Sequence, residues 1–171
     1  MLNENSIINL NIEVKSPRRF VFVLMEHFTL LSFSSALDAL RIANRMSGKK
    51  LYDWTFIGES EEFVSCSAGT QFKLDNPLIE LHRDDTILLC GGTAIQASTT
   101  KKLIGWLRRE ARRGLVIGGL CTAAYPMAKA GLLEEKKATI HWENQDSFAE
   151  EFLEVELTKT VFVCDGNRYT T

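Results

Sequence analysis

The chain has 171 residues, of which 45% are hydrophobic and 25% are charged, and its formal net charge is −2. A chain of this length and composition buries one good core and is most simply a single domain. The slightly acidic balance argues against nucleic-acid binding by this stretch itself, because neutralising phosphates requires a concentrated positive surface.

The four cysteines lie far apart and form no C-x-x-C pair. That spacing argues against a zinc site, and Cys66, Cys90, Cys121 and Cys164 fall largely in apolar runs typical of reduced, buried thiols. The chain shows no signal-peptide pattern and no apolar run of membrane-spanning length. We therefore expect a cytoplasmic protein with no metal, no cofactor and no membrane partner.

The first part of the chain predicts an arm, a strand and a helix. Residues 1–18 are polar and are expected to form a flexible amino-terminal arm. We therefore expect the folded domain to cover residues 19–171. Residues 20–25 form a continuous apolar run, typical of a strand buried on both faces of a parallel sheet. The apolar pattern then takes a helical period that ends near Gly48.

Strands and helices alternate along the rest of the chain. The remaining predicted strands cover residues 54–57, 63–67, 71–74, 86–90, 115–117, 138–141, 155–157 and 161–164. The remaining predicted helices cover residues 98–113, 122–129 and 146–152. Residues 63–74 predict a hairpin that lies outside the centre of the sheet. The alternation predicts an α/β fold, a three-layer sandwich with a mostly parallel central sheet and helices on both faces.

The predicted helix over residues 98–113 carries six cations on one face. Such a stripe can indicate DNA binding, but four of the six cluster at the carboxyl end, where positive charge favours the helix dipole. We therefore interpret the stripe as a solvated helix face.

Residues 116–125 join an apolar run, two glycines and the start of a helix, with Cys121 at the junction. We call this turn between strand and helix, at residues 120–123, the elbow. A side chain at such a turn projects from the carboxyl edge of the sheet, toward the first amides of the next helix. A nucleophilic thiol, or the anionic group of a ligand, suits that position. From this stretch alone, a tight crossover around an unreactive cysteine explains the pattern equally well.

Carboxyl ends of parallel strands meet at one sheet edge, so residues that follow the predicted strands are candidates for one site. They are Glu26, Ser32, Phe33, Gly91, Gly92, Cys121, Thr122, His141, Trp142 and Glu143. A histidine in this setting is more often a pocket or core residue than a metal ligand, and the three histidines form no metal triad. For Trp142, the sequence supports a position in the core and a position in the pocket lining equally well.

Several motifs carry a family resemblance. They are FTLL (28–31), ALDALRIAN (36–44), LLCGG (88–92), GGLCTAA (118–124), AGLL (130–133) and ATIHW (138–142). Together they resemble the PfpI-like branch of the class I glutamine amidotransferase-like superfamily, and more narrowly the amino-terminal domain of AraC-type transcription regulators. The resemblance implies a flavodoxin-like fold, a homodimer, and a helix-turn-helix domain beyond residue 171 that contacts DNA. We expect the first helix and the hairpin to form the dimer contact, because they lie beside the first strand and are not needed to cover the other face of the sheet.

The enzymes of that superfamily use a cysteine at the elbow, often a histidine about twenty residues later, and an acidic residue near the start of the first helix. Cys121 and His141 match the first two, whereas the resemblance aligns Ser32 with the acid. A thiolate without this partner loses the group that tunes its protonation. We therefore expect an effector-sensing domain rather than an enzyme. The alternative is a cysteine-dependent hydrolase or carbonyl-modifying enzyme that uses Cys121 and His141.

A narrower likeness concerns the effector. It rests on Phe33 and on residues 44–48, 51–54 and 141–144, which look like those of regulators of glycine betaine, carnitine and related quaternary-amine catabolism. The likeness implies that the elbow amides and Gly92 hold a carboxylate. Trp142 and Phe33 would then face the ammonium head, with Glu26 or Glu143 supplying a negative charge. An unrelated amino acid such as arginine is the alternative effector.

Overall fold

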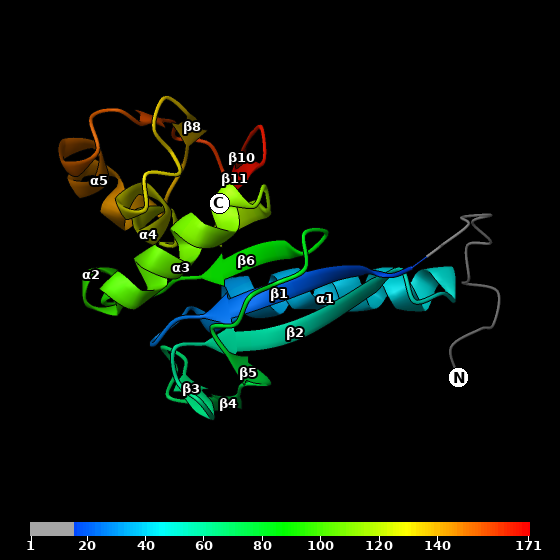
Figure 1. Ribbon diagram of the computed structural model, residues 1–171. Helices are drawn as coiled ribbons and strands as arrows, with labels where there is room; N and C mark the ends of the chain where they lie inside the picture. Colours follow the sequence, from blue (N-terminus) through cyan, green and yellow to red (C-terminus); the bar gives the residue numbers. More distant parts are fainter. Residues whose placement is uncertain (1–15) are drawn as a thin grey trace.

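The computed structural model describes residues 16–171 (Figure 1). The predicted arm over residues 1–18 lies almost entirely outside the described residues. Strand β1 begins at Arg18, two residues before the apolar run, because the backbone of Arg18 and Arg19 already pairs with β2.

A seven-stranded sheet forms the centre of the domain, in the order β10-β11-β7-β6-β1-β2-β5. All its neighbouring strands run parallel except the β10–β11 hairpin. The strands are β1 (Arg18–Leu24), β2 (Tyr52–Gly58), β5 (Asn76–Pro77), β6 (Thr86–Cys90), β7 (Val116–Leu120), β10 (Val163–Asp165) and β11 (Arg168–Thr170). Two small sheets flank it, formed by β3 (Phe63–Ser65) with β4 (Gln71–Lys73) and by β8 (Lys137–Ala138) with β9 (Glu156–Leu157).

Helices cover both faces of the sheet, with α1 on one face and α3 and α4 on the other (Figure 1). The helices are α1 (Leu30–Ser47), α2 (Ile95–Ser98), α3 (Lys101–Arg112), α4 (Ala124–Lys129) and α5 (Gln145–Glu151), with a 3-10 turn, η2, over Trp142–Asn144. The predicted three-layer α/β fold with a mostly parallel sheet is therefore confirmed.

Two apolar cores lie on the two faces, and β1 contributes to both. Val21 and Val23 pack on the side of α3 and α4, whereas Phe22 and Leu24 pack on the side of α1. Alternate side chains of a strand point to opposite faces, so a central strand covered on both sides reads as an unbroken apolar run. This explains why the run at residues 20–25 predicted the strand.

Several predicted boundaries were wrong. The helix predicted over residues 98–113 begins only at Lys101, because Thr100 caps α3 by accepting a hydrogen bond from the Leu103 N–H at 3.1 Å. The short helix α2 before it was not predicted. The strand predicted to end at residue 117 continues through both glycines to Leu120. No strand was predicted for β11, although its backbone pairs with β7.

The cations of the predicted basic face make contacts within the molecule. Arg109 and Arg113 both pair with Glu110, whose side chain is fully buried. Arg108 donates hydrogen bonds to two backbone carbonyls near the end of α4, and the Lys102 ammonium donates to the Glu59 carbonyl. Four of the six cations therefore have partners within the molecule, and Lys102, Arg108 and Arg113 link α3 to neighbouring segments.

Candidate functional site

The turn after β7 holds Cys121 in a left-handed backbone conformation. Its φ is 61°, and α4 begins three residues later at Ala124. A non-glycine residue in this region of φ costs on the order of 1–3 kcal/mol, so the surrounding structure must hold it there. The predicted sharp turn between strand and helix is present, with the half-buried thiol at the carboxyl edge of the sheet.

The side chain beside the thiol belongs to Thr29, the residue that precedes α1. The Thr29 hydroxyl oxygen lies 3.4 Å from the Cys121 Sγ. Ser32, which the resemblance aligned with the acid, instead donates its hydroxyl hydrogen to the Thr29 carbonyl at 3.0 Å. Sequence reasoning missed Thr29, and the signal for it was its place in the FTLL motif directly before the helix.

A cavity of about 540 Å³ opens over Cys121, and we call it the elbow cavity. It is lined by Thr29, Gly92, Thr93, Ala94, Ile95, Gln96, Cys121, Thr122, His141, Glu143 and Asn144. Five of the ten predicted site residues meet here, from segments that follow β6, β7 and β8. The cavity lies at the carboxyl edge of the parallel strands, where ligands bind in open α/β sheets.

Two glycines at the end of β6 let three segments of backbone approach one another closely. A Cβ on Gly92 would lie 2.1 Å from the His27 carbonyl oxygen, and one on Gly91 would lie 2.6 Å from the Ala123 nitrogen. The Thr122 hydroxyl donates to the Gly92 carbonyl at 2.8 Å and ties the two loops together. Gly91 therefore packs against the elbow and does not line the cavity, whereas Gly92 does.

The backbone amides of the elbow are mostly used within the protein. The Cys121 N–H donates to the Thr171 hydroxyl at 3.4 Å, and the Ala123 N–H donates to the Leu120 carbonyl at 3.1 Å. The Thr122 N–H donates to no acceptor within residues 16–171. Of the two amides predicted to hold an anion, that of Thr122 is the one without a partner in the protein.

His141 and Glu143 line the far wall of the elbow cavity. The His141 N–H donates to the Cys121 carbonyl at 3.2 Å, which fixes the histidine segment to the elbow. The His141 Nδ1 lies 3.9 Å from a Glu143 carboxylate oxygen. The Trp142 ring is tilted by 34° against the His141 ring at a centroid distance of 5.7 Å. Trp142 is 72% exposed, so it lies at the surface and does not line the cavity.

The structure separates Phe33 and Glu26 from this site. Phe33 is 2% exposed and belongs to the core on the α1 side, so it offers no ring face to a ligand in the elbow cavity. A periodic apolar stripe on α1 accounts for this position. Glu26 lines a second cavity, on the other side of the loop that joins β1 to α1.

The buried thiol of Cys90 lies close to Cys121. Burial raises the pKa of the Cys90 thiol far above its ordinary value, and the negative charge that Cys121 can carry raises it further. Cys90 therefore stays a neutral packing residue, as predicted. Within the described part of the chain, no three His, Cys, Asp or Glu side chains form a metal-binding group, and no helix has the length and apolar character needed to cross a membrane.

Comparison with known proteins places the chain beside both regulators and enzymes. The model of the DJ-1/PfpI family matches residues 18–171. The HTH-type transcriptional regulator GbdR of Pseudomonas aeruginosa is 34% identical over 157 residues, which are 92% of this chain and 43% of the regulator. The chain thus spans less than half the length of that relative.

Two further similarities bear on fold and function. The crystal structure of an AraC family transcriptional regulator from Pseudomonas putida superposes with a TM-score of 0.78 and 27% identity, covering 91% of this chain and 83% of that one. Isonitrile hydratase from Pseudomonas putida is 28% identical over 108 residues, which are 63% of this chain and 46% of the hydratase.

Proposed function

The chain belongs to the DJ-1/PfpI family, and we propose that it is the effector-binding domain of an AraC-type transcriptional regulator. The similarity to GbdR and to the Pseudomonas putida regulator supports this proposal. In this proposal the protein is cytoplasmic, and DNA is contacted by a helix-turn-helix domain beyond residue 171.

The observation that carries the proposal is the neutral hydroxyl of Thr29 beside the Cys121 thiol. A cysteine nucleophile needs a low pKa, which a charged or strongly hydrogen-bonding partner provides. Within the described residues, no carboxylate forms a hydrogen bond with this thiol. The elbow geometry is retained without the acid, which suits a cavity that binds a ligand and leaves it unchanged.

We propose that the effector is a zwitterion with a quaternary ammonium head, such as glycine betaine or carnitine. The free Thr122 N–H can receive the carboxylate, beside the backbone of Gly92 and Thr93. A trimethylammonium head donates no strong hydrogen bond and is held by aromatic faces and negative charge. Glu143 in the cavity wall and the exposed Trp142 next to it in the chain have that chemistry and stay in the proposed ligand set, whereas Phe33 and Glu26 leave it.

Calorimetric titration of the chain with glycine betaine, carnitine, choline and arginine tests this assignment. We expect heat from glycine betaine or carnitine and recovery of the ligand chemically unchanged. Heat from arginine alone would refute the quaternary-amine assignment. Absence of binding by all four would refute the proposed effector class.

Trp142→Ala tests the aromatic contact. An aromatic contact with a cation contributes on the order of 0.5–2 kcal/mol, so affinity should fall by a few-fold to about thirty-fold without loss of folding. Phe162→Ala is the matched control, because Phe162 is also an exposed aromatic residue (66%) but lies outside the 141–144 segment, three of whose residues line the elbow cavity. Equal effects of the two substitutions would contradict the assigned contact.

A cysteine-dependent enzyme is the second candidate, and two observations favour it. His141 and Glu143 share a cavity with Cys121, and part of the chain is similar to isonitrile hydratase. In this alternative, His141 acts as the base for the Cys121 nucleophile. It requires turnover of a nitrile, isonitrile, amide or carbonyl substrate that is lost in Cys121→Ser.

We propose that the domain pairs as a homodimer through α1 and the β3–β4 hairpin. Exposed apolar side chains on these elements support it, namely Leu31, Ile42, Met46 and Phe63. Two-fold proteins commonly read two operator half-sites, so a dimeric sensor suits a regulator. Sedimentation should show a dimer at micromolar concentration that Ile42→Asp dissociates. A wild-type monomer would contradict the proposal.

A further inference from the structure

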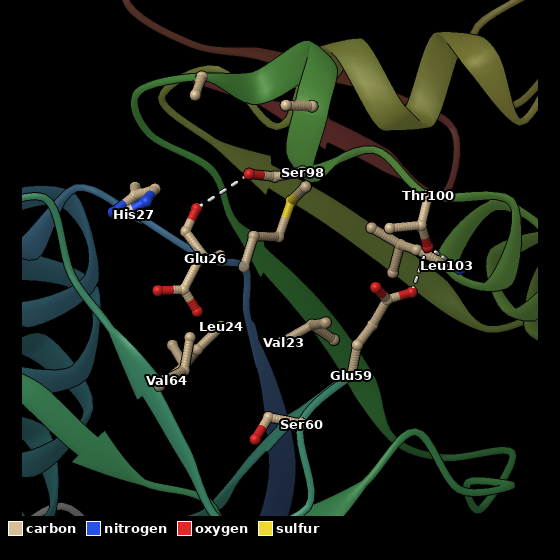
Figure 2. A pocket seen from close by; sticks show the side chains of 13 residues that line it. Val23, Leu24, Glu26, His27, Glu59, Ser60, Val64, Ser98, Thr100 and Leu103 are labelled. Atoms are coloured by element: carbon tan, nitrogen blue, oxygen red, sulfur yellow. Dashed lines mark hydrogen bonds between the residues drawn. The ribbon is translucent and has the colours of Figure 1, made fainter.

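A second cavity, of about 360 Å³, lies at the same edge of the sheet, and we call it the carboxylate cavity (Figure 2). Its lining comes from the ends of β1 and β2, from β3, from α2 and from the start of α3. It is lined by Val23, Leu24, Met25, Glu26, His27, Glu59, Ser60, Val64, Ala94, Ala97, Ser98, Thr100 and Leu103. It shares only Ala94 with the elbow cavity.

The floor of the carboxylate cavity is apolar and buried. Val23, Leu24, Met25, Val64 and Leu103 are all buried. Leu24 and Val64 belong to the core on the α1 side, whereas Val23, Met25 and Leu103 belong to the core on the opposite side. The cavity therefore opens where both cores reach the sheet edge, and its floor suits a short alkyl chain.

Two carboxylates stand above this floor. Glu59 follows β2, and one of its oxygens accepts a hydrogen bond from the Thr100 hydroxyl, which holds the side chain in place. The Glu26 carbonyl accepts a hydrogen bond from the Ser98 hydroxyl at 3.1 Å, whereas its carboxylate has no partner within residues 16–171. Figure 2 shows the two carboxylates on either side of Val23.

No lysine or arginine lines the cavity to neutralise this charge. The cation recorded beside it is Lys102, whose ammonium donates to the Glu59 backbone carbonyl at 3.3 Å. His27 is the remaining titratable group in the lining. The cavity therefore repels anions and favours a cationic ligand.

We propose that the carboxylate cavity binds a primary alkylammonium ion. The Glu26 carboxylate and the Glu59 oxygen that does not bond Thr100 each offer an acceptor to an ammonium group, and the alkyl chain lies on the apolar floor. A quaternary ammonium ion donates no such bonds and needs aromatic faces, which the lining lacks apart from the His27 imidazole. This site is independent of the effector proposed for the elbow cavity.

Titration of the isotope-labelled chain with n-butylammonium, followed by NMR, tests the proposal. We expect shifts of the Leu24, Val64 and Leu103 methyl signals, with little change at the Thr122 amide. Tetramethylammonium should bind at least about five-fold more weakly, because it forms no hydrogen bonds with the carboxylates. Butyrate should give no saturable shift at these methyls.

A pair of substitutions distinguishes a direct contact with the ammonium ion from the effect of the overall negative charge of the protein. Glu26→Gln should weaken n-butylammonium binding by about five-fold or more. Glu61→Gln is the matched control, since Glu61 is an exposed carboxylate two residues from Glu59 that does not line the cavity, and it should leave affinity unchanged. Glu59→Gln keeps an oxygen for Thr100 and should also weaken binding.

Several results would overturn the proposal. These are the absence of saturable shifts, equal shifts with butyrate, and equal losses in Glu26→Gln and Glu61→Gln. Shifts confined to the Thr122 amide would assign the ion to the elbow cavity and would also overturn it. The titration detects binding in the carboxylate cavity, beside Leu24. A negative result therefore leaves the test of effector binding in the elbow cavity unaffected.

Discussion

The elbow cavity and the carboxylate cavity lie at the same sheet edge but differ in construction. The elbow cavity is lined by glycine backbone, hydroxyls and the strained Cys121, and it lies over the turn that a short motif marks in the sequence. The carboxylate cavity combines buried aliphatic residues with two carboxylates from separate strand ends. One sheet edge thus holds a polar cavity and a negatively charged cavity with an apolar floor.

The loop from Glu26 to Thr29 is the shared wall between them. His27 lines the carboxylate cavity, and Thr29 lines the elbow cavity. His27 has a positive φ of 60°, its N–H donates to the Ser65 carbonyl, and its carbonyl accepts from the Thr93 N–H. A change that moves this loop should therefore disturb both cavities, whereas a change at a core residue that lines neither cavity should affect stability alone.

Phe33→Ala should have the largest effect and tests the assignment of Phe33 to the core. Its ring lies 5.3 to 5.6 Å from the rings of Phe22, Phe28, Phe56 and Phe72. Removing a buried phenylalanine costs about 3–5 kcal/mol of unfolding free energy. Denaturant unfolding measures this loss. If the variant instead kept its stability and bound the effector more weakly, Phe33 would be a ligand contact and its assignment to the core would be wrong.

Gly92→Ala should have the next largest effect and should disturb both cavities. The added Cβ would meet backbone atoms of His27, Phe28 and Thr29, which move only with the loop. Overpacking of this kind costs about 1–3 kcal/mol. Gly105→Ala is the matched control, because a Cβ there meets nothing within 4 Å, and an alanine in a helix should stabilise by up to about 1 kcal/mol. Equal effects of the two variants on the free energy of unfolding would contradict the close packing of Gly92 against the loop that separates the two cavities.

The order of elements and the elbow could be predicted because their signals are local. Unbroken apolar runs mark the central strands, and the helix ends at Gly48 in a left-handed conformation as its pattern indicated. β11 escaped prediction because its three residues gain strand structure from pairing with β7, which is distant in sequence.

The site could be predicted only in part, because cavity walls depend on which face each side chain meets. Gly92, Cys121, Thr122, His141 and Glu143 do line one cavity. Glu26 and Glu59 share the other only after α1 and β2 bring the ends of two strands together. Nothing local in the sequence distinguishes these two carboxylates from the other acidic residues.

Thr29→Val should have a small effect and sharpens the account of the thiol. The substitution keeps the shape but removes the hydroxyl that lies 3.4 Å from the Cys121 Sγ. The loss of one such contact costs about 0.5–1.5 kcal/mol of unfolding free energy. Effector affinity measured by calorimetry should stay within about three-fold. A much larger loss of affinity would make the Thr29 hydroxyl a ligand contact.

Cys121→Ser tests the central claim most directly, because serine keeps the size and hydrogen-bonding ability of cysteine but is a far weaker nucleophile. The measurement is calorimetric affinity for the effector, with the ligand analysed by NMR before and after incubation with wild-type chain and variant. We expect affinity within about three-fold of wild type and an unaltered ligand in both. Turnover by the wild-type chain that disappears in Cys121→Ser would contradict a sensor and establish an enzyme.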